Sequence, residues 1–244
     1  RNRKPLEAFA QASQKKEYYN PLVPTRDEQG HGQIIACLLP HVQCCREAAN
    51  LLAVRAMQHL GEGRVTEAWQ DLMICHRLGR LMEKGGTLIE YLVGVAIQSI
   101  AMQGEIVLLS QPNLNPKLLA NCGNDLQGLM PHSKIADKVD LTERFTMLNC
   151  VQYTSQMGMG FLNGLSGEGH IPDDQTVLGT LFSRSTDWNV TLKLANAWYD
   201  RWTAAARIED IQARELTLKQ LEVDLKNMMS EARETMWLNP ILSS

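Results

Sequence analysis

The chain has 244 residues, which is enough for one large domain or two modest ones with a buried core. Hydrophobic residues make up 44% and charged residues 21%, a balance typical of globular proteins and not of disordered chains. The formal net charge of -3 lacks the strongly basic character that nucleic-acid-binding domains usually have. We therefore expect no nucleic-acid partner.

The first 30 residues predict one short helix followed by an extended connector. Apolar spacing favours a helix over residues 6–16, and Pro21 and Pro24 then favour an extended chain. We expect residues 31–244 to form a single helical domain. Because the chain begins with Arg rather than Met, we interpret it as a processed product or a fragment. This leaves the compartment open between the cytoplasm and the cell envelope, the latter after removal of an N-terminal segment.

Apolar residues recur at intervals of three and four along most of the chain, which predicts an all-α fold of packed antiparallel helical hairpins. A helix is expected over residues 34–60, with a kink or a new start at Pro40. Gly61 and Gly63 should end it. Thr66 is the expected cap of the next helix, which should end near Gly85.

The most apolar stretch of the chain covers residues 88–109. Thr87 and Glu90 predict a capping box at its start. Because this helix is apolar on nearly every side, we expect it at the centre of the fold. A membrane-spanning role is not expected, since it would bury polar groups on several faces: Glu90, Gln98, Gln103 and Glu105.

Two further helices and a glycine-rich segment follow. Asn115 and Pro116 have the character of an N-cap and a first helical residue, so they predict a helix ending near Gly128. Another helix is expected over residues 138–157. The segment 158–179 is glycine-rich and irregular, and loops of this length in compact domains are usually functional or disordered.

The last third of the chain predicts a long helical region over residues 187–237, with aromatic residues on one face. These residues either form core or line a ligand cleft: Trp188, Trp198, Tyr199 and Trp202. Further along, four apolar residues are spaced by three and four, as in a heptad seam: Leu218, Leu221, Leu225 and Met228. The seam either packs on its own domain or binds another chain, and it covers only about two heptads.

Residues 52–80 contain the spacing of a helical hairpin with a glycine turn. Ala56 provides a small residue where paired helices approach each other, and contacts on the second helix follow the turn at Gly63, Val65, Ala68 and Leu72. This stretch resembles one tetratricopeptide unit, although Arg80 stands where that repeat has proline. No second unit follows at a 34-residue period, and packing of a single hairpin explains the same pattern.

Short motifs are spread over the chain from residue 38 onward, at residues 38–43, 55–63, 68–72, 76–81, 136–145, 187–189 and 196–201. Together they resemble a family of uncharacterised all-helical proteins of environmental bacteria. The resemblance implies a large helical protein, often associated with the cell envelope after an N-terminal hydrophobic segment. It implies no activity, so no catalytic residue is carried over.

The residues that could carry chemistry do not form a complete set. Cys37, His41, Cys44 and Cys45 have a spacing that places soft metal ligands on one helical face, but Pro40 interrupts it. Small buried thiols and a capped histidine are the alternative, and we expect no metal and no cofactor. The six cysteines are expected to be mostly reduced. No nucleophile elbow, P-loop or zinc-protease motif occurs, so catalysis is not favoured, although an enzyme stays open.

Two functions remain after these exclusions. The leading hypothesis is a non-enzymatic protein–protein interaction or scaffold protein, which binds a protein partner or forms a homo-oligomer through helical grooves or the C-terminal helix. The alternative is a small-molecule-binding helical domain, with segment 158–179 as a lid over the aromatic face. Such a domain could be an enzyme.

Overall fold

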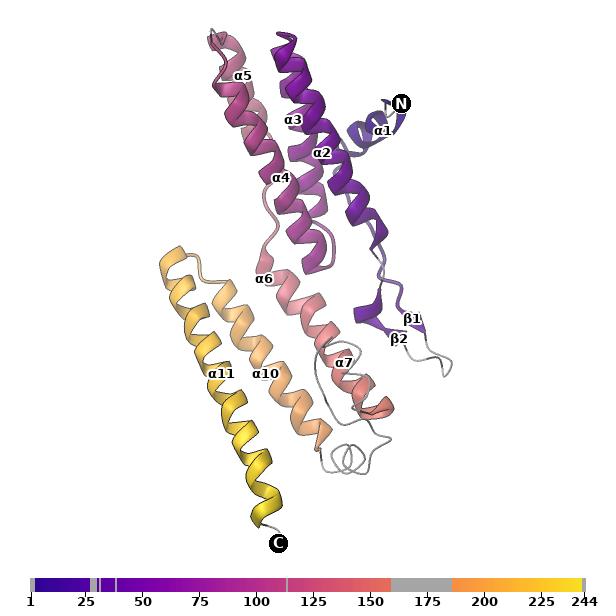
Figure 1. Ribbon diagram of the computed structural model, residues 1–244, viewed down its shortest axis with the longest axis vertical. Helices are drawn as coiled ribbons and strands as arrows, with labels where there is room; N and C mark the ends of the chain where they lie inside the picture. Colours follow the sequence, from indigo (N-terminus) through magenta and orange to yellow (C-terminus); the bar gives the residue numbers. More distant parts are fainter. Residues whose placement is uncertain are drawn as a thin grey trace. The chain divides into compact units, whose positions relative to one another are not determined.

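The computed structural model describes residues 3–26, 30, 32–37, 39–112, 114–158 and 186–242. They divide into two compact units, residues 1–134 and 135–244. Both units are built of helices, so the predicted all-α fold is confirmed (Figure 1). The boundary between units falls after Lys134, whereas the sequence suggested a boundary near residue 30 and one domain from there on.

The N-terminal residues belong to unit 1 because they pack on its helices. Helix α1 (Arg3–Ala12) lies against the side of α2 and α3, and Leu6 enters the hydrophobic core (Figure 1). The chain then runs extended past Pro21 and Pro24, as predicted. Two very short antiparallel strands follow, β1 (Thr25–Arg26) and β2 (Gly32–Gln33), with Thr25 opposite Gln33.

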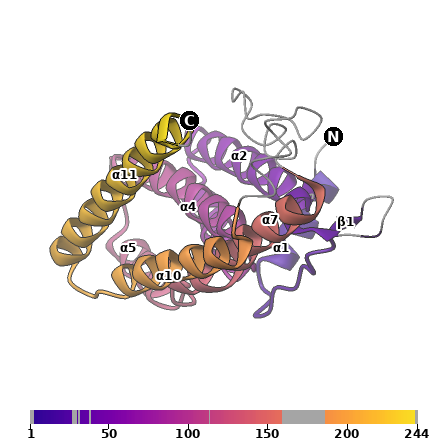
Figure 2. The same cartoon turned by 90° about the horizontal axis from the view of Figure 1, so that it is seen from below.

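Three long helices form the centre of unit 1. After the short 3-10 turn η1 (Ile34–Ala36), helix α2 (Pro40–Gly61) begins at its proline, as predicted, since the first turn needs no donor there. Helix α3 (Val65–Met82) and helix α4 (Leu88–Leu109) follow, and each of the three packs on the other two (Figures 1 and 2). Residue 63 has a φ of 75°, so glycine suits the turn before α3.

The predicted cap of α3 was wrong. Arg64 occupies the N-cap position without a side-chain hydrogen bond, and Thr66 lies inside the first turn. Gly63 reverses the chain so tightly that the helix starts one residue after Arg64, before Thr66 can serve as a cap. By contrast, Asn115 caps α5 (Pro116–Gln127) as predicted, because its Oδ1 accepts a hydrogen bond of 2.9 Å from the Lys117 amide.

Two hydrophobic clusters form the core of unit 1. The first joins α1, α2, α3 and α4, and its most buried members include Ala49, Leu52, Cys75, Met82, Ile97 and Ala101. The second joins α2, α3, α4 and α5, and includes Ala56, Trp69, Leu72, Leu108 and Cys122. The i+4 spacing of apolar residues in α2 and α3 therefore marks true core positions.

Unit 2 consists of a broken helix and a helical hairpin. Helix α6 (Ile135–Lys138) continues through the π-helical turn η2 (Val139–Glu143) into α7 (Arg144–Met157), so the predicted helix over 138–157 begins earlier and carries an irregular turn. Helix α10 (Trp188–Ala206) packs on α7 and runs antiparallel to α11 (Ile211–Leu242) (Figures 1 and 2). The predicted long helical region is thus two helices, separated by residues 207–210.

Arg144 ties the irregular turn of unit 2 to α10. Its guanidinium donates to Asp140 at 2.7 Å, to Asn196 at 3.0 Å and to Asp200 at 2.6 Å. Arg207 also donates to Asp140, at 2.7 Å. Asp140 in the irregular turn therefore accepts hydrogen bonds from two arginines of unit 2.

Candidate functional site

Helix α4 is fixed in unit 1 by its N-terminal cap. The Thr87 hydroxyl accepts a hydrogen bond of 3.0 Å from the Glu90 amide, and the Glu90 carboxylate accepts one of 2.9 Å from the Thr87 amide. The predicted capping box is confirmed. This pair defines both the start of α4 and the rotation of its first turn.

Close backbone contact with α3 determines which face of α4 is buried. A Cβ on Gly94 would lie 2.6 Å from the Gly79 carbonyl oxygen, and a Cβ on Gly79 would lie 2.7 Å from that of Gly94. One helical turn further in each direction, Glu90 and Gln98 are also buried. Glycine at this crossing lets the two backbones meet, so the same face of α4 stays against α3 along its length.

Three polar residues of α4 contact other parts of unit 1, whereas Ser99 and Gln103 are exposed. Glu90 is fully buried, and its Oε1 accepts hydrogen bonds from Tyr18 Oη at 2.6 Å and Asn20 Nδ2 at 3.2 Å. Gln98 donates to the buried carboxylate of Glu83, and Glu105 lies 2.8 Å from His76 Nε2. Each of these three polar side chains thus connects α4 to a different part of the unit.

Burial and hydrogen bonding act in opposite directions on the Glu90 carboxyl. Burial alone raises its pKa, but the hydrogen bonds from Tyr18, Thr87 and Asn20 outweigh this and hold the pKa below its usual value. Burial beside this carboxylate raises the pKa of Tyr18 strongly, so the phenol remains a donor. His41 Nε2 lies 3.1 Å from the same carboxylate oxygen.

The opposite face of α4 is exposed and mostly apolar, with Ser99 and Gln103 as its exposed polar residues, which corrects the expectation that this helix lies at the centre of the fold. Its exposed large side chains are Ile89, Leu92, Val95, Met102, Ile106, Val107 and Leu109. Glu90 and Glu105 are the only acidic or basic residues in α4, and both are engaged inside the unit, so this face carries no charge at neutral pH. We call these seven residues the α4 apolar face.

A concave region borders the α4 apolar face. Val95 and Met102 line a cavity of 280 Å³ together with Leu126 and Leu129, which lie at the end of α5 and just beyond it. His76, Arg80, Gln98 and His132 supply polar groups to the same cavity. The apolar surface therefore extends from a convex helix into a groove beside it.

Helix α4 is the single helix in the described ranges that is long and apolar enough to cross a membrane by length and composition. One third of its most apolar window, 33%, is buried inside unit 1. A core helix of a water-soluble bundle passes the same test, so this finding alone is weak. Its three buried polar anchors show that α4 is packed as a member of the bundle.

The predicted heptad seam lies on the side of α11 that faces α10. Leu221 is buried with only 4% of its surface exposed, and Leu218, Leu225 and Met228 are half-buried. Trp198 Nε1 on α10 donates to the Met228 sulfur at 3.2 Å. Partner binding through these four residues stays a prediction, and it would require another chain to displace α10.

The predicted aromatic face is divided between two neighbours. Trp198 lies toward α11. The Arg201 guanidinium carbon lies over the Trp198 ring, 4.4 Å from the ring centre, and Arg201 also forms an ion pair with Asp224. Tyr199 is half-buried near Glu143 and Cys150, and this partial burial raises its pKa. Trp188 and Trp202 are half-buried in α10. A cavity of 460 Å³ between α10 and α11 is lined by Trp198 and Met228.

Two other predicted features have different outcomes. The proposed lid, residues 158–179, lies outside the described residues except for Gly158, which ends α7. His41 points to Glu90 rather than to Cys37 or Cys44, and within the described ranges no group of three metal-ligating side chains gathers. All six cysteines are free thiols, and burial raises the pKa of Cys75 to about 12.

Comparisons of the chain with protein-family models, with curated proteins and with solved structures give no match. The resemblances to a tetratricopeptide unit and to a bacterial helical family therefore stay predictions.

Proposed function

We propose that this chain is a non-enzymatic interaction protein that self-associates through the α4 apolar face. The observation that supports the proposal is a 22-residue helix whose exposed side carries seven large apolar side chains and no charge. An exposed helix face that is mostly apolar, here with Ser99 and Gln103 among the apolar side chains, is unfavourable in water and typically marks an interaction site. The docking surface is thus placed on α4 rather than on the C-terminal seam.

A second copy of the chain is the partner that this surface fits best. Two copies of an uncharged face can meet across a two-fold axis without like charges in contact, and such an interface uses the same residues twice. The face extends over about 30 Å, the length of the helix from Ile89 to Leu109. A surface of this length matches a helix packed along α4.

The expected affinity is modest. Each of the seven side chains is about half exposed, so its further burial contributes about 1 kcal/mol. Two copies together would gain on the order of 10 kcal/mol, which is comparable with the estimated cost of association. We therefore expect a reversible dimer rather than an obligate one.

Sedimentation equilibrium of the whole chain tests this proposal. We expect the mass to rise from monomer toward dimer as the concentration approaches about 100 μM. Ile106→Lys should weaken the dimer by about tenfold or more, because two lysines would be buried at the interface. Leu216→Lys is the matched control, since Leu216 on α11 is 68% exposed and Ile106 is 69% exposed.

Other outcomes of the sedimentation experiment would overturn the proposal or assign the α4 apolar face to a different partner. A wild-type chain that stays monomeric over this range overturns the proposal. So does a dimer that Leu216→Lys weakens and Ile106→Lys does not. A monomer that sediments with uncharged phosphatidylcholine vesicles, and loses this property in Ile106→Lys, would assign the face to lipid instead of a second copy.

A further inference from the structure

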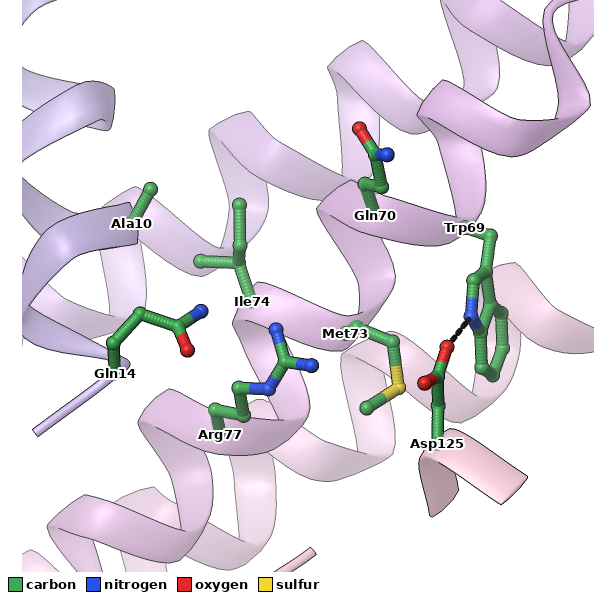
Figure 3. Close-up of a pocket in the computed structure, with 8 residues that line it drawn as sticks. All are labelled: Ala10, Gln14, Trp69, Gln70, Met73, Ile74, Arg77 and Asp125. Atoms are coloured by element: carbon green, nitrogen blue, oxygen red, sulfur yellow. Dashed lines mark hydrogen bonds between the residues drawn. The ribbon is translucent and has the colours of Figure 1, made fainter. Parts of the chain in front are cut away.

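A second surface of unit 1, on the opposite side of α3 from its crossing with α4, forms a groove between α1 and α5. Figure 3 shows its first part, a cavity of 280 Å³ with Ala10 and Gln14 on one side and Trp69 and Asp125 on the other. Met73 and Arg77 lie on α3 between these two sides. A second cavity of 140 Å³ continues from it, since both are lined by Gln14 and Arg77.

The second cavity is strongly basic. No Asp or Glu is among its lining residues. Four cationic residues line it: Lys15, Lys16, Arg77 and Arg80. Arg77 and Arg80 are three residues apart on α3 and so lie on one face of the helix. Lys15 and Lys16 follow α1, and Lys84 Nζ donates to the Lys16 carbonyl at 2.6 Å, which ties this segment to the end of α3.

Arg80 has donors that the protein does not use. Its Nε and Nη1 atoms are buried and have no hydrogen-bond partner among the described residues. Burial lowers the pKa of this guanidinium, which reflects the cost of holding a cation away from water. Buried unpaired donors are rare in folded proteins, and an ion or ligand is one of the explanations for them.

The nearest carboxylates are already committed elsewhere. Glu83 lies one turn from Arg80, but its oxygens accept from Gln98, from His132 Nδ1 at 2.9 Å and from the Ser133 amide at 3.1 Å. Asp125, in the first cavity, accepts from Trp69 Nε1 at 2.8 Å (Figure 3). Neither carboxylate forms an ion pair with Arg77 or Arg80 among the described residues, although the nearby Glu83 charge partly offsets the effect of burial on the Arg80 pKa.

The first cavity adds an apolar wall to this basic end. Trp69, Met73 and Ile74 line it along α3. A ligand that fills both cavities would place an apolar body against these side chains and an anionic group beside Arg77 and Arg80. Several cations around one small space match a dianion with several acceptor oxygens better than a singly charged carboxylate.

We propose that the groove along α3 binds a small organic phosphate monoester, with its phosphate at Arg77 and Arg80 and its apolar body against Trp69, Met73 and Ile74. The site uses no residue of the α4 apolar face, but Arg80 and Leu129 also line the cavity that borders that face. Bound phosphate would accept hydrogen bonds from the buried Nε and Nη1 donors of Arg80, which otherwise destabilise the folded protein because they have no partner.

Isothermal titration calorimetry of the whole chain with phenyl phosphate tests the proposal. We expect phenyl phosphate to bind more tightly than inorganic phosphate, which lacks the apolar body, and than phenol, which lacks the anion. Benzoate should bind more weakly than phenyl phosphate, and binding should weaken as salt is added. Inorganic phosphate that binds as tightly as phenyl phosphate, or benzoate that binds more tightly, would overturn the assigned ligand class.

Three arginine variants locate the site. Arg80→Gln and Arg77→Gln should each weaken phenyl phosphate binding by about tenfold or more, because each removes charge-assisted hydrogen bonds. Arg46→Gln makes the same change of charge at an exposed position of α2 and should leave binding unchanged. Arg77→Gln still tests the site if Arg80→Gln fails to fold. No binding to the wild-type chain, or equal losses in all three variants, rules the site out.

Discussion

Individual residues of unit 1 show how a buried charge is accommodated without an ion pair to lysine or arginine. The Glu90 carboxylate has no exposed surface, and five donor groups surround its two oxygens. Such a group is stable as an anion only while these hydrogen bonds persist. The capping motif visible in the sequence supplies two of them, and the residues of the N-terminal connector and α2 supply the others.

This arrangement predicts a specific dependence of stability on pH. Because the folded pKa of Glu90 lies below its unfolded value, the unfolded chain takes up the proton first as the pH falls. The contribution to the free energy of unfolding is therefore complete above about pH 5 and is lost as the pH falls through the folded pKa. Urea unfolding of wild type and Glu90→Gln at neutral and acidic pH measures it.

We expect the loss of stability on acidification to be smaller in Glu90→Gln than in wild type. Tyr18→Phe removes one donor while retaining the carboxylate, so it should move the acid transition to higher pH. An equal loss in wild type and Glu90→Gln would contradict the assignment. Tyr18→Phe provides the second measurement if the glutamine variant is too unstable.

At the scale of elements, the relation between α3 and α4 depends on two glycines. A Cβ at residue 94 would lie 2.6 Å from one backbone oxygen and 2.9 Å from the Glu83 amide nitrogen. Neither atom belongs to a flexible side chain, so the helices would have to separate. Separation would also disturb the hydrogen bond between Gln98 and Glu83.

Gly94→Ala should therefore destabilise the protein by about 1–3 kcal/mol, as expected for overpacking. The control is Gly123→Ala in α5, where an added Cβ meets no atom within 4 Å. There we expect a small stabilisation of up to about 1 kcal/mol, because alanine favours a helix over glycine. Thermal unfolding followed by circular dichroism measures both, and similar effects of the two substitutions would refute the close crossing.

Helix α4 shows why apolar composition alone did not predict which side of a helix is buried. Glycine at one face and polar residues bonded to neighbours determine its buried side, which leaves large apolar residues such as Ile106 in solvent. A helix that is apolar on all sides gives no amphipathic signal for its orientation. The seam of α11 differs from this case, because its four spaced apolar residues are buried or half-buried, while their binding to a partner stays a prediction.

At the scale of the whole molecule, the chain is organised as two compact units. The buried carboxylates of unit 1 find their partners within that unit. Asp71, for example, accepts from Arg55 at 2.8 Å and 2.6 Å, which joins α3 to α2. Unit 1 also has its own hydrophobic clusters. A unit with its own core and with partners for its buried carboxylates is expected to fold independently.

We therefore expect residues 1–134, expressed alone, to be helical and to unfold cooperatively. Circular dichroism during heating checks this expectation. As a comparison, a chain that stops at residue 109 lacks α5, including Cys122 of the second core cluster, and should unfold at a lower temperature. A fragment 1–134 without a cooperative transition would mean that unit 1 depends on the rest of the chain.

The sequence by itself determined the helical class, the capping box at Thr87 and the cap at Asn115, and it left a kink or a new start near Leu39 as alternatives for α2. These features depend on residues close together in the chain, where periodicity and capping chemistry act locally. It also located the core positions of α2 and α3, because helical spacing places them on one face.

Only the tertiary structure decided the boundary after Lys134, the exposed face of α4 and the groove along α3. Arg77 and Arg80 were visible in the sequence as ordinary helical cations, and nothing nearby in the chain indicated that Lys15 and Lys16 would join them. Such groupings depend on which helices pack together. That choice follows from long-range contacts, such as the crossing of Gly79 and Gly94, which local patterns do not encode.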